Sequence, residues 1–297
     1  MGQRFSMDRY KTRWAYTFLA FPILFYIVVR YYPTFNAFYI SMTDWNIVSK
    51  EKHFIGLANF KLLFSDEVFY QTMGNTIRYT VYGLPIGLLL SFTLAYLIDR
   101  AGALESFFKA AYFVPYITSL VALSWVWRWL YQQAPIGVFN NILISLGLPQ
   151  QGFLYDKDQA LFAVLAPTIW AYVGFQMVIF LAGLKAIPER YYEAASIDGA
   201  SRRQQLFRIT LPLLRPTVVF LLIVGSIYYL RIFTQVYNMS YQGGGGPLNA
   251  TKPIVLHIYN SAFRHFEMGY ASALTVILFA IIMVITLIEL RVTKSHD

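Results

Sequence analysis

The sequence predicts an all-α integral membrane protein with six transmembrane helices. Two features lead to this fold class. Only 13% of the 297 residues are charged and 57% are hydrophobic, and the uncharged residues gather in runs that approach or exceed the roughly 20 residues a helix needs to cross a bilayer. Because backbone polar groups find no water inside lipid, each run is expected to be a helix, which satisfies its own hydrogen bonds.

The six expected spans form a single transmembrane domain over residues 1–297. They lie at approximately 14–32, 77–98, 110–131, 160–184, 214–233 and 271–290. The first and fifth uncharged runs are short, and each gains length if Arg30 or Arg231 at its end extends its charged head to the lipid headgroups. The first run is not expected to be a cleavable signal, because Tyr31 and Tyr32 follow it instead of small residues.

Basic residues are concentrated on one side of the expected topology. The two terminal tails and the loops 99–109 and 185–216 hold 14 Lys and Arg in 63 residues, whereas the loops of the other side hold 10 in 121. The positive-inside rule therefore places both termini and these two loops in the cytoplasm. The net charge of +9 is thus a topology signal and does not indicate a nucleic-acid partner.

The composition argues against several chemistries. The chain has no cysteine, and its four histidines lack metal-ligand spacing, so no catalytic or metal site is expected. No Gly-Lys pair exists to end a phosphate-binding loop, and Gly243–Gly246 is expected to be a flexible turn. The six uncharged runs contain no carboxylate; Asp99 and Glu289 stand at edges. An ion-coupled carrier or a membrane enzyme is therefore disfavoured.

Local signals refine the expected helices. Pro85, Pro115 and Pro167 fall inside spans two to four, where neighbouring helices tolerate a fixed kink. On the outer side, apolar residues in 54–75 recur at helical spacing, and Asp66 stands where a second short helix could begin.

The cytoplasmic segment 185–213 is longer than a helix hairpin needs. Pro188 followed by Glu189 is typical of a helix start, and Asp198–Gly199 is typical of a helix end with glycine in the left-handed conformation. Two short helices joined by a tight glycine corner are therefore expected.

The second of these helices has its own start and stop signals. Ser201 and Gln204 form a capping-box pattern, and the helix should run to about Thr210 and end at Pro212. Helices this short are marginal alone, so another surface must cover them. The small side chains of Ala194, Ala195 and Ala200 favour a protein partner that approaches the backbone closely. A basic helix that lies on anionic lipid is the alternative.

The same loop carries a family pattern. Glu193-Ala194-Ala195, Gly199, Ile209, Leu211 and Pro212 match EAA-x3-G-x9-I-x-LP without a departure. This resembles the signature loop of permease subunits of ATP-binding-cassette importers, in the carbohydrate-uptake group that includes maltose, lactose and glycerol-3-phosphate permeases. The segments 54–80, 110–131, 183–200 and 243–263 are also similar to family segments.

The resemblance implies a type I ABC importer permease fold with a cytoplasmic coupling helix that docks on a separate ATPase. The residues it assigns to ATPase coupling are Glu193, Ala194, Ala195, Asp198, Gly199, Ala200, Ile209, Leu211 and Pro212. It implies no cofactor on this chain, with ATP and Mg on the ATPase dimer. The other implied partners are a second permease subunit, with a heterodimer favoured, and an extracytoplasmic solute-binding protein.

A sugar or oligosaccharide is the expected substrate, carried across the cytoplasmic membrane by a multi-pass permease. The candidate pathway residues are Trp170, Tyr172, Gln176, Ser226, Tyr229 and Arg231. Their hydroxyl, amide and aromatic groups could contact a sugar, although such residues also bridge packed membrane helices. Arg128 and Arg231 leave open an anionic or non-sugar solute, such as glycerol phosphate or an acidic saccharide.

Overall fold

The computed structural model describes residues 2–48 and 51–294, and every regular element in this part of the chain is a helix. Two isolated β-bridges, Thr43–Phe54 and Asn46–Glu267, are its only strand-like pairings. Five helices are long and apolar enough to cross a membrane, and a pair of helices that meet at 93° forms a sixth candidate. The predicted all-α, six-span class is confirmed.

The chain divides into two compact units, residues 1–65 with 258–278 and residues 66–257 with 279–297. The first unit contains α1 (Gly2–Tyr26), η1 (Ile27–Tyr31), α2 (Tyr32–Ile40) and α3 (Ala58–Leu63). The second contains α4 (Glu67–Ile98), η2 (Gly102–Leu104), α5 (Glu105–Ile117), α6 (Leu120–Leu130), α7 (Val138–Ser145), η3 (Phe153–Tyr155), α8 (Ala160–Lys185), α9 (Arg190–Ile197), α10 (Arg202–Gln205), η4 (Leu206–Thr210), α11 (Leu211–Leu213), α12 (Arg215–Leu230), α13 (Thr234–Met239) and η5 (Tyr241–Gly243). Both units share α14 (Ile254–Phe263) and α15 (Met268–Lys294).

In the first unit, the span-length helix is followed by a compact loop. The apolar span runs over Tyr10–Ile40, longer than the expected 14–32. After it, the buried Asn59 amide Nδ2 donates to the carbonyls of Ser41 at 2.9 Å and Thr43 at 2.8 Å. These bonds fix the chain where it leaves α2, because they occupy carbonyls that the helix end leaves unpaired.

The second unit begins at the cap of α4. The Asp66 carboxylate accepts the Val68 amide at 2.8 Å, as its place in the sequence predicted. The helix that starts here is not a second short helix, however. It runs for 32 residues through Pro85 and is itself the second span, so that span begins ten residues earlier than expected.

The third expected span, 110–131, is bent sharply. Helix α5 ends at Ile117, α6 begins at Leu120, and their axes differ by 93°. Thr118 and the N-cap residue Ser119 adopt ψ angles of 145° and 122°. Hydroxyl side chains compete with helical hydrogen bonds, and the Thr118 hydroxyl donates to the Val114 carbonyl at 2.8 Å. Pro115 lies inside α5, two residues before its end.

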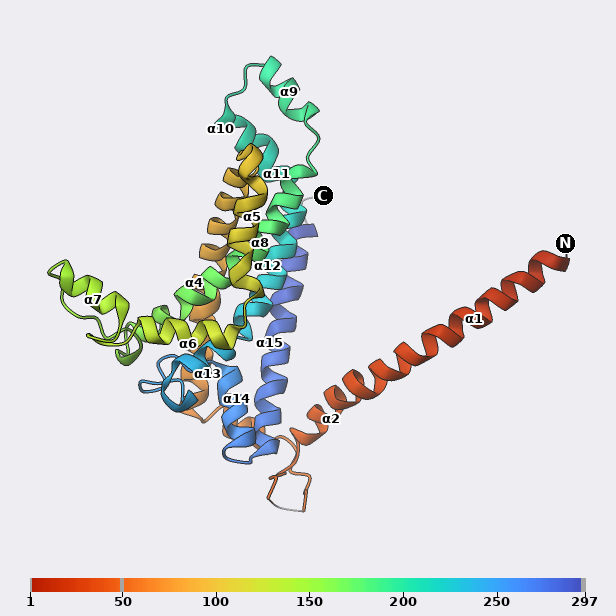
Figure 1. The fold of residues 1–297 in the computed structure, drawn as a ribbon. Helices are drawn as coiled ribbons and strands as arrows, with labels where there is room; N and C mark the ends of the chain where they lie inside the picture. The colour runs from red at the N-terminus through yellow and green to blue at the C-terminus, as the bar shows by residue number, and fades with distance from the viewer. Residues whose placement is uncertain (1, 49–50, 295–297) are drawn as a thin grey trace. The chain divides into compact units, whose positions relative to one another are not determined.

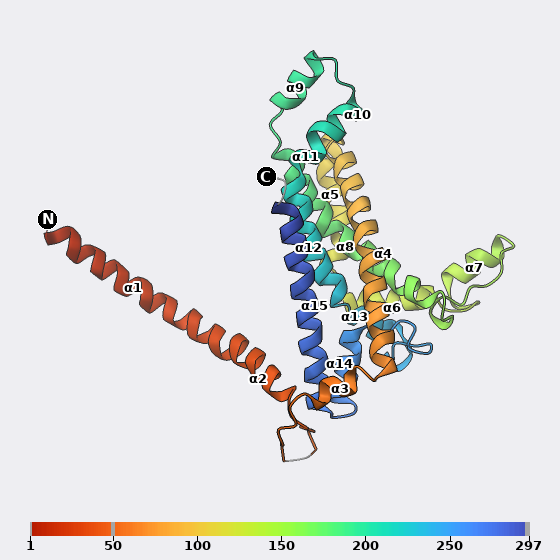
Figure 2. The same cartoon turned by 180° about the vertical axis from the view of Figure 1, so that it is seen from behind.

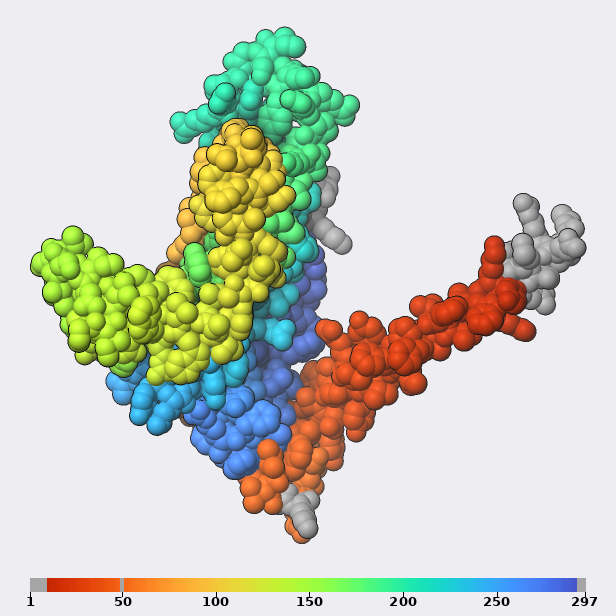
Figure 3. Space-filling model, in the orientation of Figure 1, coloured from red at the N-terminus to blue at the C-terminus, as the bar shows by residue number. Residues whose placement is uncertain are grey.

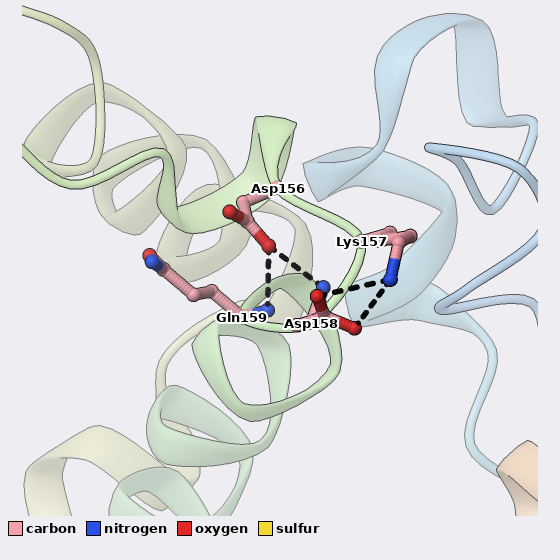
Figure 4. Close-up of polar contacts among 4 residues, drawn as sticks. All are labelled: Asp156, Lys157, Asp158 and Gln159. Carbon is pink, nitrogen blue, oxygen red and sulfur yellow. Dashed lines mark hydrogen bonds and ion pairs between the residues drawn. The ribbon is translucent and has the colours of Figure 1, made fainter.

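Helix α8 starts at a turn built by aspartate. The Asp156 carboxylate accepts the amides of Asp158 at 2.7 Å and Gln159 at 3.3 Å, while Lys157 pairs with Asp158 (Figure 4). The Asp156 carbonyl accepts the Ala160 amide at 2.9 Å. Asp156 therefore shapes the turn before α8, and its backbone carbonyl satisfies the amide of Ala160, one of the donors that the first helical turn leaves free.

Helix α8 is the most buried span of the second unit, with 72% of its apolar window covered. It packs against α4 and α5. On α4, Gly83, Gly87 and Ser91 are buried and four residues apart. Gly87 and Ser91 face Gln176 of α8, and Gly83 faces Tyr229 of α12. Small residues at this spacing let membrane helices approach closely. The Ser91 hydroxyl lies 2.7 Å from the Gly87 carbonyl and 3.1 Å from Gln176 Oε1 of α8.

The two ends of the second unit differ. Helices α9, α10 and α11 lie at the same end as the carboxy-terminal turns of α15, while α6, α7 and α13 lie at the opposite end (Figures 1 and 2). The cytoplasmic and outer loops of the expected topology are thus on opposite ends of this unit.

The loop that follows Gly243–Gly246 is held by side chains of α4. Asn75 of α4 donates through Nδ2 to the carbonyls of Asn249 at 2.8 Å and Lys252 at 3.1 Å. Gln71 donates to the Leu248 carbonyl, and the Tyr79 hydroxyl donates to the Thr251 carbonyl. Polar residues one and two helical turns apart on α4 therefore hold the loop backbone.

A glycine pair on α4 tests this packing. A Cβ at Gly83 would overlap the Tyr229 ring, whereas a Cβ at Gly74 would meet nothing within 4 Å. We expect Gly83→Val to destabilise the chain by about 1–3 kcal/mol through overpacking, seen as a lower midpoint of thermal unfolding in detergent. Gly74→Val is the matched control, and an equal loss in both variants would contradict close packing at Gly83.

Candidate functional site

The corner after α9 is a complete helix-ending motif. Gly199 has a φ of +76°, a conformation that glycine adopts without cost. The Ala200 amide donates to the Ala195 carbonyl at 2.8 Å, and the Gly199 amide donates to the Ser196 carbonyl at 3.1 Å. These two bonds define a Schellman ending. The corner at Gly199 is therefore closed by backbone bonds to Ala195 and Ser196 of α9.

The second part of the loop starts as predicted. The Gln204 amide donates to Ser201 Oγ at 3.3 Å and the Ser201 amide donates to Gln204 Oε1 at 2.7 Å, so the capping box is confirmed. The predicted end at Pro212 is wrong. The helical path continues through η4, a π-type turn, and Pro212 lies inside α11. Because proline lacks an N–H, the wider turn accommodates it, and the direction changes at Leu214 before α12.

Side chains tie α9 to the segment that returns to the membrane. The Tyr192 hydroxyl lies 2.9 Å from the Thr210 hydroxyl, and Thr210 is buried. Gln205 Nε2 donates to Ser196 Oγ at 2.9 Å. These two contacts were not predicted, because partners 18 and 9 residues apart across a glycine corner give no local signal. The loop is therefore a small braced unit.

This bracing divides α9 into two faces. Ala195 and Tyr192 are half-buried toward the returning segment, while Glu193 and Ala194 are exposed. Ile197, on the same face as Glu193 and Ala194 by helical spacing, has 87% of its surface exposed. The loop projects beyond the ends of α4 and α5 (Figure 3). An apolar side chain is thus presented at the tip of the molecule's second unit.

The remaining coupling candidates lie around this corner. Asp198 caps α9 and is exposed, and Ala200 is half-buried. Ile209 and Leu211 are half-buried on the returning segment, and Pro212 is exposed. The structure thus brings the EAA pattern together at one corner, with its first part outward and its last part toward the membrane helices.

A second feature is an aromatic cavity of about 390 Å³ inside the second unit. It lies where the α5–α6 bend meets α8, α12 and α13. Non-helical backbone at membrane depth is tolerated where it is buried in protein or lines a cavity. Its principal side chains are Tyr116, Tyr172, Phe175, Tyr228, Arg231 and Gln235.

The rings of this cavity are stacked in a fixed order. Tyr172 and Tyr228 are parallel within 5°, with centroids 3.9 Å apart. Tyr116 stacks on Phe175 with centroids 5.1 Å apart. Gln235 Nε2 donates to the Tyr228 hydroxyl at 3.1 Å. The cavity therefore combines aromatic faces with an amide, hydroxyl groups and the exposed Arg231.

The six predicted pathway residues do not line one common cavity. Tyr172 and Arg231 line the aromatic cavity. Gln176, Ser226 and Tyr229 are buried at contacts between helices, and the Ser226 hydroxyl donates to Glu289 Oε2 of α15 at 3.2 Å. Trp170 lines a separate apolar groove.

The analysis of the sequence missed Tyr116, Phe175, Tyr228 and Gln235 as cavity residues. Tyr228 lies beside the predicted pathway residue Tyr229, and Tyr116 follows Pro115, where the sequence predicted a fixed kink but not a bend of 93°. Only the bend after α5 brings Tyr116 to the cavity. Arg128, considered for an anionic solute, instead lies over the Trp125 ring and donates to the Asn238 carbonyl.

The helix-ending motif at Gly199 can be tested by substitutions that change the cost of its left-handed backbone conformation. Gly199→Ala places a Cβ in a left-handed conformation, which costs roughly 1–2 kcal/mol. We expect hydrogen exchange at the Ala200 amide to quicken by about fivefold or more. Gly199→Asn is the control because asparagine tolerates this conformation better; equal protection in Gly199→Ala and the parent chain would contradict the motif.

Comparison with known proteins identifies the family. The model of the binding-protein-dependent transport system inner membrane component matches residues 1–294. The probable ABC transporter permease protein YesP of Bacillus subtilis is 35% identical over 95% of this chain and 90% of its own length. The arabinooligosaccharides transport system permease protein AraP of the same organism is 31% identical over 94% and 88%.

Among solved structures, a bacterial ABC transporter involved in import of the acidic polysaccharide alginate contains a chain with the same fold. The TM-score is 0.86 at 23% identity, covering 99% of both chains. A complex of a bacterial alginate ABC transporter with its pentasaccharide-bound periplasmic protein gives a TM-score of 0.84 at 24% identity, over 97% of this chain and 98% of that one. The resemblance drawn from the EAA pattern is confirmed, and the chain belongs to the family of binding-protein-dependent transport system inner membrane components as a multi-pass permease subunit of an ABC transporter.

Proposed function

We propose that this chain forms part of the translocation pathway of an ATP-driven importer for a sugar or oligosaccharide. The observation that carries the proposal is the combination of a braced, outward-facing corner at one end of α8 and α12 with an aromatic cavity between the same two helices. A membrane permease needs both a surface that receives mechanical input and a site that contacts the solute.

The coupling role rests on the exposed face of α9. Ile197, Glu193 and Ala194 offer an apolar side chain beside a charged and a small one, a composition suited to a protein groove. The corner that carries them is braced by Tyr192–Thr210 and Ser196–Gln205, so displacement of α9 would move the start of α12. A separate ATPase dimer that holds ATP and Mg is the proposed partner, and this chain binds no cofactor.

The sugar assignment rests on the aromatic cavity. Stacked tyrosines present apolar faces, and the amide of Gln235 together with tyrosine hydroxyls can pair with sugar hydroxyls. Relatives named for arabinooligosaccharides and for diacetylchitobiose support a saccharide. Tyr172 and Arg231 are the predicted pathway residues that line this cavity. Trp170, Gln176, Ser226 and Tyr229 lie outside the cavity, and their contact with the solute stays a prediction.

An anionic solute is the second candidate, favoured by Arg231 on the cavity wall. A guanidinium can pair with a carboxylate or phosphate in a bidentate geometry. Relatives named for sn-glycerol-3-phosphate and sulfoquinovosyl glycerol fit such a solute. An acidic saccharide would satisfy both the rings and the arginine.

The proposed partners of this chain would bind surfaces at the two ends of the second unit. The loop Gly243–Thr251, which α4 contacts, and the loop 132–159 are proposed to meet an extracytoplasmic solute-binding protein. A second permease subunit, different from this one, is proposed as a partner alongside lipid. Both termini are proposed to be cytoplasmic, with the α9 corner.

Coupling can be tested at Ile197. Ile197→Asp should abolish co-purification with the ATPase subunit, because a charge cannot enter an apolar groove without a large desolvation cost. Membrane insertion should be unchanged. Ile144→Asp is the control, since Ile144 is 49% exposed on α7 at the opposite end. Unchanged co-purification in Ile197→Asp would contradict the coupling role of the exposed face of α9.

The cavity can be tested at Tyr228. In proteoliposomes holding the complete transporter, Tyr228→Ala should reduce oligosaccharide uptake by roughly threefold to tenfold, as expected for loss of an aromatic contact. Tyr228→Phe, which keeps the ring, should lose less. Trp129→Ala serves as the control, since Trp129 is 51% exposed on α6 and does not line the cavity; a loss in that variant but not in Tyr228→Ala would contradict the assigned site.

A further inference from the structure

A large cavity of about 670 Å³ lies at the outer end of the second unit, apart from the aromatic cavity. One wall is a row on α4, Tyr70, Gly74, Arg78 and Tyr82, spaced four residues apart and therefore on one helix face. Gly74 leaves the middle of this row open, because a Cβ there would meet nothing within 4 Å. Arg78 is exposed and has no ion-pair partner among the described residues.

The facing wall is the turn that starts α8. Lys157 and Asp158 line the cavity, with their charged groups 2.9 Å apart (Figure 4). The hydrogen bond and negative charge of Asp158 raise the pKa of Lys157, so its ammonium stays charged. With Arg78, the charged side chains that line the cavity carry one net positive charge.

The rest of the cavity is firmly built. Leu248 and Ala250 close it on one side, and Gln71 and Asn75 of α4 hold that loop through its backbone carbonyls. On the membrane side, the rings of Tyr82 and Phe162 lie 5.4 Å apart. Each of the three elements around the cavity is thus fixed by its own contacts.

Below this polar cavity, α4 and α8 together with Tyr112 of α5 line an apolar groove of about 390 Å³. Its α4 residues Ile86, Leu90 and Leu94 continue the four-residue row from Arg78 and Tyr82. Its α8 side continues from Phe162 through Ala166 to Trp170. The polar cavity and the apolar groove therefore follow one another along the α4–α8 pair, toward the inner end.

The length of this succession is enough for the acyl chain of one lipid leaflet. Sixteen residues separate Arg78 from Leu94, the last α4 residue of the groove, which is roughly 24 Å at the rise of an α-helix. Half of the hydrocarbon core of a bilayer is about 15 Å. A cationic cavity at the outer end followed by an apolar groove of this length has the polarity pattern of one membrane amphiphile.

We propose that the α4–α8 groove binds one anionic phospholipid. Its phosphate lies against Arg78 and Lys157, and one acyl chain lies along Ile86, Leu90 and Trp170. A headgroup with a single net negative charge, as in phosphatidylglycerol, matches the single net positive charge of the cavity. Assignment to the outer leaflet rests on the proposed topology; the binding itself does not depend on topology or on the transported solute.

The test is native mass spectrometry of the purified full chain with added phosphatidylglycerol or phosphatidylcholine of identical acyl chains. We expect one phosphatidylglycerol to be retained in preference. Arg78→Gln should weaken its retention about fivefold, the change for one cationic contact near a membrane surface. Leu90→Trp should weaken it by filling the groove while leaving the cationic cavity intact.

Two controls match these variants. Lys61→Gln removes an exposed cation on α3, and Leu89→Trp enlarges an exposed α4 residue that does not line the groove; neither should alter retention. If Leu90→Trp does not fold, Ile86→Trp replaces it. Equal retention of both lipids, or no effect of Arg78→Gln, would overturn the headgroup site.

The remaining outcomes separate other occupants. Displacement of the lipid by soluble glycerol phosphate, with no effect of Leu90→Trp, would show a small-anion site and overturn the proposal. Displacement by an oligosaccharide at concentrations that support uptake would likewise replace the lipid by a saccharide. Uptake that persists in Arg78→Gln, together with lost lipid retention, leaves the proposed import function intact and supports the lipid site.

Discussion

The second unit depends on the close packing of α8 against α4 and α12. Lipid tails are as apolar as leucine, so hydrophobic burial does not drive these helices together. Contact distance and hydrogen bonding do. Gly83 and Gly87 remove side-chain bulk from α4, and Ser91 reaches Gln176 across the contact. An apolar cluster that includes Ala95, Phe180 and Leu221 extends the packing toward the inner end.

This packing gives one pair of helices two roles. Helix α8 carries Tyr172 and Phe175 and leads directly into the α9 corner; α12 begins where that corner returns and carries Tyr228. If the proposed function holds, α8 and α12 transmit a displacement of α9 to the aromatic cavity as rigid helices, because both helices carry residues of that cavity. The stacked pair Tyr172–Tyr228 spans the two helices, so it is the contact most exposed to a change in their relative position.

The outer end is equally well ordered. Asn75 and Gln71 bind loop carbonyls on one side of α4, while Arg78 and Tyr82 face the outer cavity on another. One helix thus fixes the loop proposed to meet the binding protein and forms one wall of the proposed lipid site. Its polar outer turns explain why α4 begins ten residues before the predicted span 77–98.

The sequence alone determined the fold class, the family and the glycine corner, because these depend on local signals: apolar runs, the EAA spacing, and capping residues close to each other in the chain. Tertiary structure decided the rest. Contacts between residues tens of positions apart decide four features. They are the bend after Ile117, the burial of Gln176, Ser226 and Tyr229, the contribution of Tyr116 and Tyr228 to one cavity, and the attachment of the loop after the glycine run to α4. Side chains such as Tyr and Gln can bridge helices or line a cavity, and only the packing of neighbouring helices selects between these two uses.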